Sequence, residues 1–118
     1  MKKVLLIEDD ELILKLVEFK LKKEGFQVYI AKDGDSGMKA VHELQPDLVV
    51  TDLMMPFKSG LELTYLIKSE YPDIPVIVLS ALGEEQSSVE KAFQLGAADF
   101  ISKPFNTNEF LERIRRFV

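Results

Sequence analysis

Polar residues stand at the ends of four short apolar runs in this chain. Glu8 and Asp9 follow the first of these runs, Asp52 ends another, Ser80 ends a third and Lys103 follows the last. A lone carboxylate in a run such as VVTDLMMP is unfavourable, because burying its charge costs several kcal/mol or keeps the group protonated. The run therefore predicts that Asp52 has a charged partner or a chemical task.

These residue types fit the handling of a phosphoryl group. Glu8, Asp9 and Asp52 would repel one another at close range, and a hard divalent cation such as Mg²⁺ would relieve that repulsion while keeping a place for a phosphate oxygen. Lys103 adds a positive charge and Ser80 a hydrogen-bond donor, which together could stabilise a phosphoryl group in transit. Asp52 is then the candidate nucleophile, and its product would be an acyl phosphate.

Each residue taken singly has a simpler structural explanation. Acidic residues often cap helices, and Asp10 could cap the helix that follows it. Ser80 could satisfy its own backbone, and Lys103 could be a solvated surface residue. Capping alone does not explain four strands that end in matched polar groups, so the set as a whole favours a functional site.

Short apolar runs and longer amphipathic segments alternate along the chain. Strands are expected at KVLLI (3–7), FQVYIA (26–31), LVVTD (48–52), PVIVLS (75–80) and DFIS (99–102). Helices are expected at 11–24, 35–44, 60–70, 84–95 and 107–117. The first helix should bury one stripe, consisting of Leu12, Ile13, Leu16, Val17 and Leu21.

The alternation predicts a doubly wound α/β fold. Runs 3–7, 48–52 and 75–80 are nearly all apolar, as expected for strands buried on both faces of a parallel sheet. Run 26–31 alternates, with Phe26, Val28 and Ile30 on one side, which is typical of an edge strand. Right-handed crossovers would place helices on both faces, and functional groups would gather at the carboxyl ends of the strands.

Composition limits the class of protein. The chain has 118 residues, 47% of them hydrophobic and 30% charged, which suits one globular domain. Its net charge of -5 disfavours broad binding to nucleic acid or to an anionic membrane. It has no cysteine, which excludes disulfides and thiolate chemistry, and its apolar runs are too short to span a bilayer. We expect a cytoplasmic protein.

Five ordered motifs carry a resemblance to a known family. They are LLIEDDE (5–11), PDLVVTDLMMP (46–56), SGLEL (59–63), PVIVLSA (75–81) and LGAADFISKPF (95–105). In order and spacing the chain resembles the receiver domain of bacterial two-component response regulators, of the chemotaxis-regulator type. The resemblance implies a flavodoxin-like (βα)5 sandwich with strand order 2-1-3-4-5. Residues 1–118 would form one receiver domain, either alone or as the N-terminal part of a longer protein.

The resemblance also assigns roles in a phosphorelay. Asp52 would accept a phosphoryl group from a sensor histidine kinase or a phosphotransfer protein, and Ser80 and Lys103 would bind its oxygens. The Mg²⁺ ligands would be Glu8, Asp9, Asp52 and the backbone carbonyl of Met54. Such a domain assists its own phosphorylation and slow dephosphorylation but is not a turnover enzyme. No contact with nucleic acid or membrane is implied.

A conformational switch is implied as well. Phe100 stands at the usual aromatic switch position and would turn inward as Ser80 moves towards the phosphate. This would alter the surface of the fourth helix, fifth strand and fifth helix, a face through which some members dimerise. Asp99 and Arg113 stand at matching places for such a homodimer, although the set of charges is reduced. The Lys103–Pro104 peptide bond should be cis.

Several positions depart from the usual pattern or carry weaker signals. Phe57 replaces a frequent glycine beside the site, where its ring could pack locally or touch a partner. Met54 and Leu82 flank the expected phosphoryl position and are both apolar, so neither could orient an attacking water, and we expect slow loss of the phosphoryl group. His42, the only histidine, is expected to be a surface residue.

Three other functions are alternatives to the switch. A Mg²⁺-dependent phosphohydrolase with an aspartyl nucleophile would need an acid two residues after Asp52, where Met54 stands. A flavin-phosphate electron carrier would be disfavoured by the acidic residues 8–10, which repel phosphate. An unphosphorylated interaction module on the same fold would not need the full set of site side chains.

Overall fold

Five strands form one parallel sheet in the computed structural model, which describes residues 1–55, 57–81 and 86–118. They are β1 (Lys3–Ile7), β2 (Gln27–Ala31), β3 (Leu48–Asp52), β4 (Val76–Ser80) and β5 (Asp99–Ser102). Their order in the sheet is β2-β1-β3-β4-β5, and all four pairings are parallel. This is the flavodoxin-like order that the family resemblance implies, with β2 at one edge and β5 at the other.

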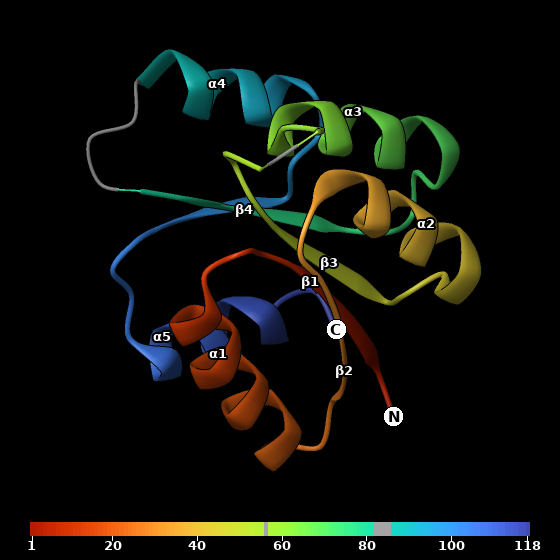
Figure 1. The fold of residues 1–118 in the computed structure, drawn as a ribbon. Helices are drawn as coiled ribbons and strands as arrows, with labels where there is room; N and C mark the ends of the chain where they lie inside the picture. The colour runs from red at the N-terminus through yellow and green to blue at the C-terminus, as the bar shows by residue number, and fades with distance from the viewer. Residues whose placement is uncertain (56, 82–85) are drawn as a thin grey trace.

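Helices cover both faces of this sheet (Figure 1). They are α1 (Glu11–Lys23), α2 (Gly34–Leu44), α3 (Gly60–Glu70), α4 (Gln86–Gln94) and α5 (Thr107–Arg115). Helices α1 and α5 lie together on one face, and α2, α3 and α4 lie side by side on the other. The predicted element bounds agree with these to within two residues, apart from residues 84 and 85 of the fourth helix, which lie outside the described residues.

Local sequence explains where the helices begin. Asp10, Asp33, Ser59 and Asn106 are the N-cap residues of α1, α2, α3 and α5, and each side chain accepts a hydrogen bond from a backbone N–H of the first turn. These bonds satisfy amide groups that have no partner inside the helix. Asp10 is thus the cap of α1, which is the simpler of the two roles considered for an acid at this position.

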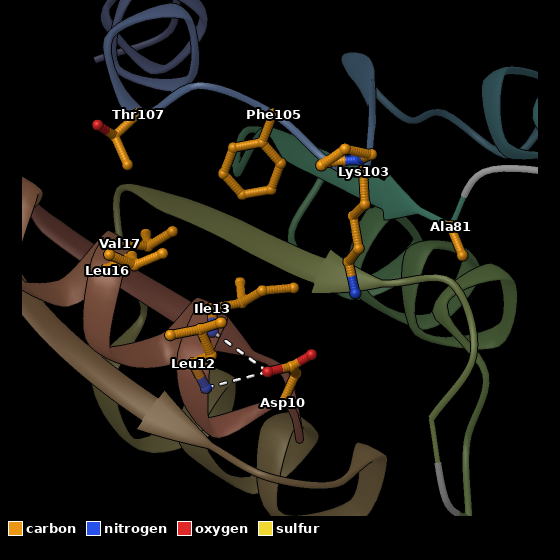
Figure 2. A pocket seen from close by; sticks show the side chains of 10 residues that line it. Asp10, Leu12, Ile13, Leu16, Val17, Ala81, Lys103, Phe105 and Thr107 are labelled. Carbon is orange, nitrogen blue, oxygen red and sulfur yellow. Dashed lines mark hydrogen bonds between the residues drawn. The ribbon is translucent and has the colours of Figure 1, made fainter.

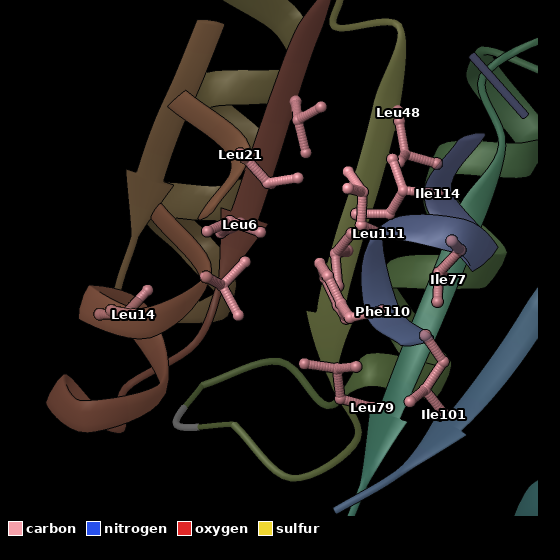
Figure 3. Close-up of a cluster of buried hydrophobic side chains, with 13 residues drawn as sticks. Leu6, Leu14, Leu21, Leu48, Ile77, Leu79, Ile101, Phe110, Leu111 and Ile114 are labelled. Carbon is pink, nitrogen blue, oxygen red and sulfur yellow. The ribbon is translucent and has the colours of Figure 1, made fainter. Parts of the chain in front are cut away.

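Two apolar clusters hold the layers together. The first core cluster lies between the sheet and α1 and α5 (Figure 3) and consists of Val4, Leu6, Leu14, Val17, Leu21, Leu48, Val50, Ile77, Leu79, Ile101, Phe110, Leu111 and Ile114. The second core cluster lies on the other face and consists of Leu5, Ile7, Ala31, Met38, Val41, Val49, Leu53, Leu63, Ile67, Val76, Val78, Ala92 and Ala97. Successive residues of the central strands enter opposite clusters, as a strand buried on both faces requires.

The strands differ in burial as their sequences predict. Every residue of β3 and β4 is buried, whereas β2 is mostly half-buried or exposed. Phe26 and Val28 pack against the first core cluster, but Ile30, which was expected on the same side, is 36% exposed. Among the described residues, no helix is long and apolar enough to cross a membrane.

Helix α1 turns a different face to the core from the one expected. Its buried residues are Leu14, Val17 and Leu21, while Leu12 and Leu16 are 67% and 51% exposed. An α-helix advances about 100° per residue, so positions 12 and 16 lie nearly opposite position 14. The expected stripe was wrong at Leu12 and Leu16 because α1 carries apolar side chains on two faces, and only one of them meets the sheet.

Gly60 lets the start of α3 approach the end of β3. A Cβ atom at this position would lie 2.4 Å from the carbonyl oxygen of Asp52 and 2.8 Å from Cα of Leu53. The Gly60 N–H also donates to the carbonyl of Leu53 at 2.7 Å. Because these neighbours are backbone atoms, no side-chain rotation can make room for a methyl group.

We therefore expect Gly60→Ala to lower the free energy of unfolding by about 1–3 kcal/mol, the usual cost of forced overpacking. Urea denaturation followed by circular dichroism would measure it. The comparison is Gly37→Ala in α2, where the added Cβ would meet side-chain atoms of buried Ile7 at 2.6–3.1 Å rather than backbone, and where alanine favours the helix, so the loss should be smaller. Equal stability of the two variants would contradict the proposed backbone constraint.

Candidate functional site

The carboxyl ends of β1, β3, β4 and β5 bring the predicted site residues to one edge of the sheet. Glu8 and Asp9 follow β1, Asp52 and Ser80 are the last residues of β3 and β4, and Lys103 follows β5. Register aligns the ends, since Asp52 lies beside Leu79 and Ser80 beside Ser102. The backbone N–H of Lys103 donates to the carbonyl of Ser80 at 2.6 Å, which fixes the start of the lysine side chain.

Lys103 lies between two of the acids. Its Nζ is 2.6 Å from Oε1 of Glu8 and 3.1 Å from Oδ2 of Asp52. All three side chains are largely withdrawn from solvent, with Glu8 2% and Asp52 8% exposed. Asp52 is therefore not an unpaired charge in an apolar run: it ends a buried strand in contact with an ammonium group.

Glu8 is only partly satisfied in this arrangement. Its Oε2 accepts a hydrogen bond from the backbone N–H of Asp9 at 3.0 Å and a longer one from that of Asp10 at 3.4 Å. Its Oε1 touches the Lys103 ammonium but accepts no well-directed hydrogen bond from the described residues. The contact is thus an ion pair that leaves this oxygen with capacity for another electrophilic partner.

Burial and neighbouring charges shift the pKa values of Glu8 and Lys103. Burial raises the pKa of Glu8 to about 6; the ammonium of Lys103 lowers it and the charge of Asp52 raises it, without reversing the effect of burial. Burial lowers the pKa of Lys103, but its contacts with Glu8 and Asp52 outweigh that effect and raise it overall. Lys103 therefore keeps its charge near neutral pH, and burial makes Glu8 costly to ionise.

The three acids form a cluster with the donor set of a hard cation. Glu8, Asp9 and Asp52 each offer a carboxylate oxygen, and these oxygens lie within 4.8 Å of one another. Asp9 is exposed, so the cluster opens to solvent on one side. Three carboxylates face one ammonium group, so an excess of negative charge remains, and Oε1 of Glu8, which is ion-paired with Lys103 but accepts no well-directed hydrogen bond from the described residues, is one of the atoms that could bind a cation. These residues fit a divalent ion such as Mg²⁺.

The other residues expected near the site are placed as follows. Ser80 is buried, and its hydroxyl donates to the carbonyl of Ala81 at 3.2 Å. Met54 and Phe57 are 68% and 79% exposed in the loop after β3, so the ring of Phe57 does not pack locally. Phe57 also has φ 71°, a left-handed conformation that favours glycine. Leu82 lies outside the described residues, so slow loss of the phosphoryl group stays a prediction.

An apolar groove opens beside the acids. It has a volume of about 430 Å³ and lies between α1 and the segment that joins β5 to α5 (Figure 2). Leu12, Ile13 and Leu16 line one side, and Phe105 lines the other, with Lys103 at the end nearest the acids. The exposed face of α1 that sequence patterning misassigned is thus one wall of a groove that ends at the site.

The backbone at Phe100, the expected switch position, is held by a hydrogen bond and an ion pair that sequence patterning did not reveal. The peptide bond between Lys103 and Pro104 is cis, as predicted. Phe100 is half-buried, and Arg113 donates to its carbonyl at 3.3 Å. Arg113 also pairs with Asp99 at 3.1 Å within the same chain. The two residues assigned to a dimer contact therefore have each other as partners in the monomer.

His42 contacts two residues at the end of another helix, α3. Its Nδ1 lies 2.9 Å from the hydroxyl of Tyr71, and its Nε2 lies 3.4 Å from a carboxylate oxygen of Glu70. The ring is about half exposed, as expected for a surface residue. It joins the last turn of α2 to the end of α3, away from the carboxyl ends of the strands.

Solved structures and a family model match this chain along nearly its whole length. The receiver domain of NtrX from Brucella abortus is 32% identical over 96% of this chain and 95% of its own, with TM-score 0.89. In NtrX from the same organism in complex with ADP, the match is 32% identical with TM-score 0.90 and covers 98% of this chain but 26% of the longer one. The chemotaxis response regulator CheY4 of Vibrio cholerae is 26% identical over 100% of this chain and 99% of its own, with TM-score 0.91.

The family model assigns the chain as a whole. Residues 4–115 match the model of the response regulator receiver domain. Two-component systems use such domains as signalling switches that interact with histidine kinases or phosphotransfer proteins. With this match, the sheet order and the acid cluster at the strand ends, the chain belongs to the family of response regulator receiver domains.

Proposed function

We propose that this chain is a phosphoacceptor switch in which Asp52 receives a phosphoryl group from a histidine kinase or a phosphotransfer protein. The observation that carries the proposal is the position of Lys103, whose ammonium pairs with Asp52 at 3.1 Å and with Glu8 at 2.6 Å among three clustered acids. The ammonium group offsets part of the cost of burying a carboxylate at this edge, and a carboxylate oxygen is the nucleophile that forms an acyl phosphate. Residues 1–118 would act as one cytoplasmic receiver domain.

Asp52, Lys103 and Ser80 would have different roles in the transfer. An oxygen of Asp52 forms the new P–O bond while the P–N bond of the donor phosphohistidine breaks, and the imidazole nitrogen keeps the electron pair. Lys103 and the hydroxyl of Ser80 would bind the oxygens of the transferred group, which carries about 1.5 to 2 negative charges.

Mg²⁺ would be held by Glu8, Asp9, Asp52 and the backbone carbonyl of Met54. A bound Mg²⁺ would neutralise charge on the phosphoryl oxygens.

Signalling would follow from a shift in population rather than from turnover. The transferred oxygens compete for Lys103 and for the hydroxyl of Ser80, which now donates to its neighbour's carbonyl. Drawing Ser80 towards them would favour an inward Phe100 and change the surface of α4, β5 and α5. A homodimer through this face, using Asp99 and Arg113, would have to exchange their pairing within the chain for pairing between chains.

A phosphohydrolase is the less favoured alternative. Such an enzyme would need a second acid two residues after Asp52 to activate water or protonate a leaving group. The residue two positions on is Met54, whose side chain is apolar and 68% exposed. An interaction module that is never phosphorylated is also less favoured, because it would not need the buried charges of Glu8, Asp52 and Lys103 at one edge.

The protein donor would dock across the apolar groove. The groove runs from exposed Leu12 and Leu16 on α1 to Lys103, so a partner helix lying in it would present its histidine to the acid site. A small donor needs no such contact. This difference separates recognition of the partner from the chemistry at Asp52.

The direct test of the acceptor is phosphorylation by acetyl phosphate. We expect intact-mass spectrometry to show one added phosphoryl group in Mg²⁺ buffer and none in excess EDTA or in Asp52→Asn, because this variant lacks the nucleophilic carboxylate. Asp73→Asn, which alters an exposed aspartate, is the matched control and should be modified like the wild type. Undiminished labelling of Asp52→Asn would refute the assignment, and continuing release of phosphate from simple esters would favour the phosphohydrolase.

The groove is tested by Leu16→Asp. A charge in an apolar contact surface should reduce phosphotransfer from a histidine kinase, selected because it phosphorylates the wild-type chain, by about tenfold or more. The rate with acetyl phosphate should stay unchanged, since Leu16 does not touch the acids. Glu112→Gln, a change at an exposed position of α5, serves as a surface control. An equal fall in both rates, or no fall with the kinase, would count against docking in the groove.

Glu8→Gln tests the balance of charges. Because the pKa of Glu8 in the folded chain is about 6 rather than 4.5, this residue makes folding less favourable as pH rises between these values. In EDTA at pH 7 we expect the variant to be more stable than the wild type by about 1–2 kcal/mol, and by less at pH 4.5. Added Mg²⁺ should stabilise the wild type more than the variant in thermal melts. A variant less stable than the wild type in EDTA, with Glu112→Gln neutral, would contradict this account.

A further inference from the structure

Phe93 and Phe100 form a ring contact between α4 and β5. Their ring centroids are 6.5 Å apart and their planes are tilted by 42°. Phe93 is 47% exposed, whereas Phe100 is half-buried and packs against the second core cluster. One part of the Phe100 ring therefore lies against the core and another against Phe93. Aromatic pairs at this separation and tilt attract each other beyond their burial of apolar area.

The backbone of Phe100 has little freedom to move. Its N–H donates to Oδ1 of Asp99 at 2.8 Å, and its carbonyl accepts from Arg113 at 3.3 Å. The same guanidinium nitrogen binds both carboxylate oxygens of Asp99, at 3.1 and 3.2 Å. Pairing with Val78 of β4 fixes the strand on its other side. The freedom that remains at this position is rotation of the ring about its side-chain bonds.

We propose that Phe93 is a positioning residue that holds the ring of Phe100 in its half-exposed position before phosphorylation. An inward turn of the ring breaks its contact with Phe93, so the contact favours the unphosphorylated conformation. Phe93 belongs to α4, so the position of this helix sets how strongly the ring is held. The link from ring to phosphorylation rests on the proposed function, whereas the link from Phe93 to the ring does not.

The test compares Phe93→Ala with Phe93→Leu, which keeps apolar volume but removes the ring. Selective labelling of phenylalanine allows NMR to follow the Phe100 ring in the free protein and with Mg²⁺ and beryllofluoride, a phosphate mimic. We expect Phe93→Ala to increase the inward population and to tighten beryllofluoride binding by the same factor, roughly two- to tenfold. Phe93→Leu should give a smaller change.

The control is Phe19→Ala, which removes a 72% exposed ring from α1 on the opposite face of the sheet. It should leave both the Phe100 signals and the affinity for beryllofluoride unchanged. The inference is overturned if the mimic binds the wild type but Phe93→Ala alters neither measurement. If Phe93→Ala does not fold, as judged by circular dichroism, Phe93→Leu and Phe93→Met decide the same comparison.

Failure of the proposed function looks different. In that case beryllofluoride would bind neither the wild type nor any variant at Asp52. If Phe93 holds the ring of Phe100, the inward population of this ring in the free Phe93 variants would still differ from that in the free wild type. A ring that is unchanged in the free protein would refute the role of Phe93 whatever the mimic does.

Discussion

One ammonium group faces three carboxylates at the carboxyl edge of the sheet, and the rest of the site depends on this imbalance. Lys103 is close enough to Glu8 and Asp52 to offset part of the cost of burying both carboxylates. Its single charge cannot balance two buried acids and the nearby Asp9. Charges withdrawn from water interact strongly and are costly when they lack partners. The remaining negative charge suits the edge to a cation, and in the proposed function the lysine would bind phosphoryl oxygens.

The charged groups stay close together because the sheet that carries them cannot relax. All residues of β3 and β4 are buried between two apolar clusters, so the backbone of Asp52 is fixed by packing on both faces. Gly60 lets α3 close over the end of β3, where a methyl group would strike backbone atoms. A change of charge at Asp52 must therefore be accommodated by side chains and loops. Lys103 and Ser80 carry the nearest movable groups.

The sequence was sufficient for the elements and for the edge where the site lies. Apolar runs, caps such as Ser59 and the rule that parallel strands end together do not depend on details of packing. The features that it missed arise between elements distant in the chain. The buried face of α1 depends on which of two apolar faces meets the sheet, and the pairing of Asp99 with Arg113 depends on how α5 lies against β5. The partners of His42 come from another helix in the same way.

Strand β5 is held at both ends, and this limits how a signal could cross it. Lys103 is anchored after the strand by the acids and by the carbonyl of Ser80, while Asp99 and Arg113 anchor its start around Phe100. A strand fixed in this way cannot slide along β4 without breaking ion pairs at one end or the other. Rotation of a ring breaks none of these contacts. A change at Lys103 is therefore more easily transmitted through the rotamer of Phe100 and the helix that touches it than through movement of the strand itself.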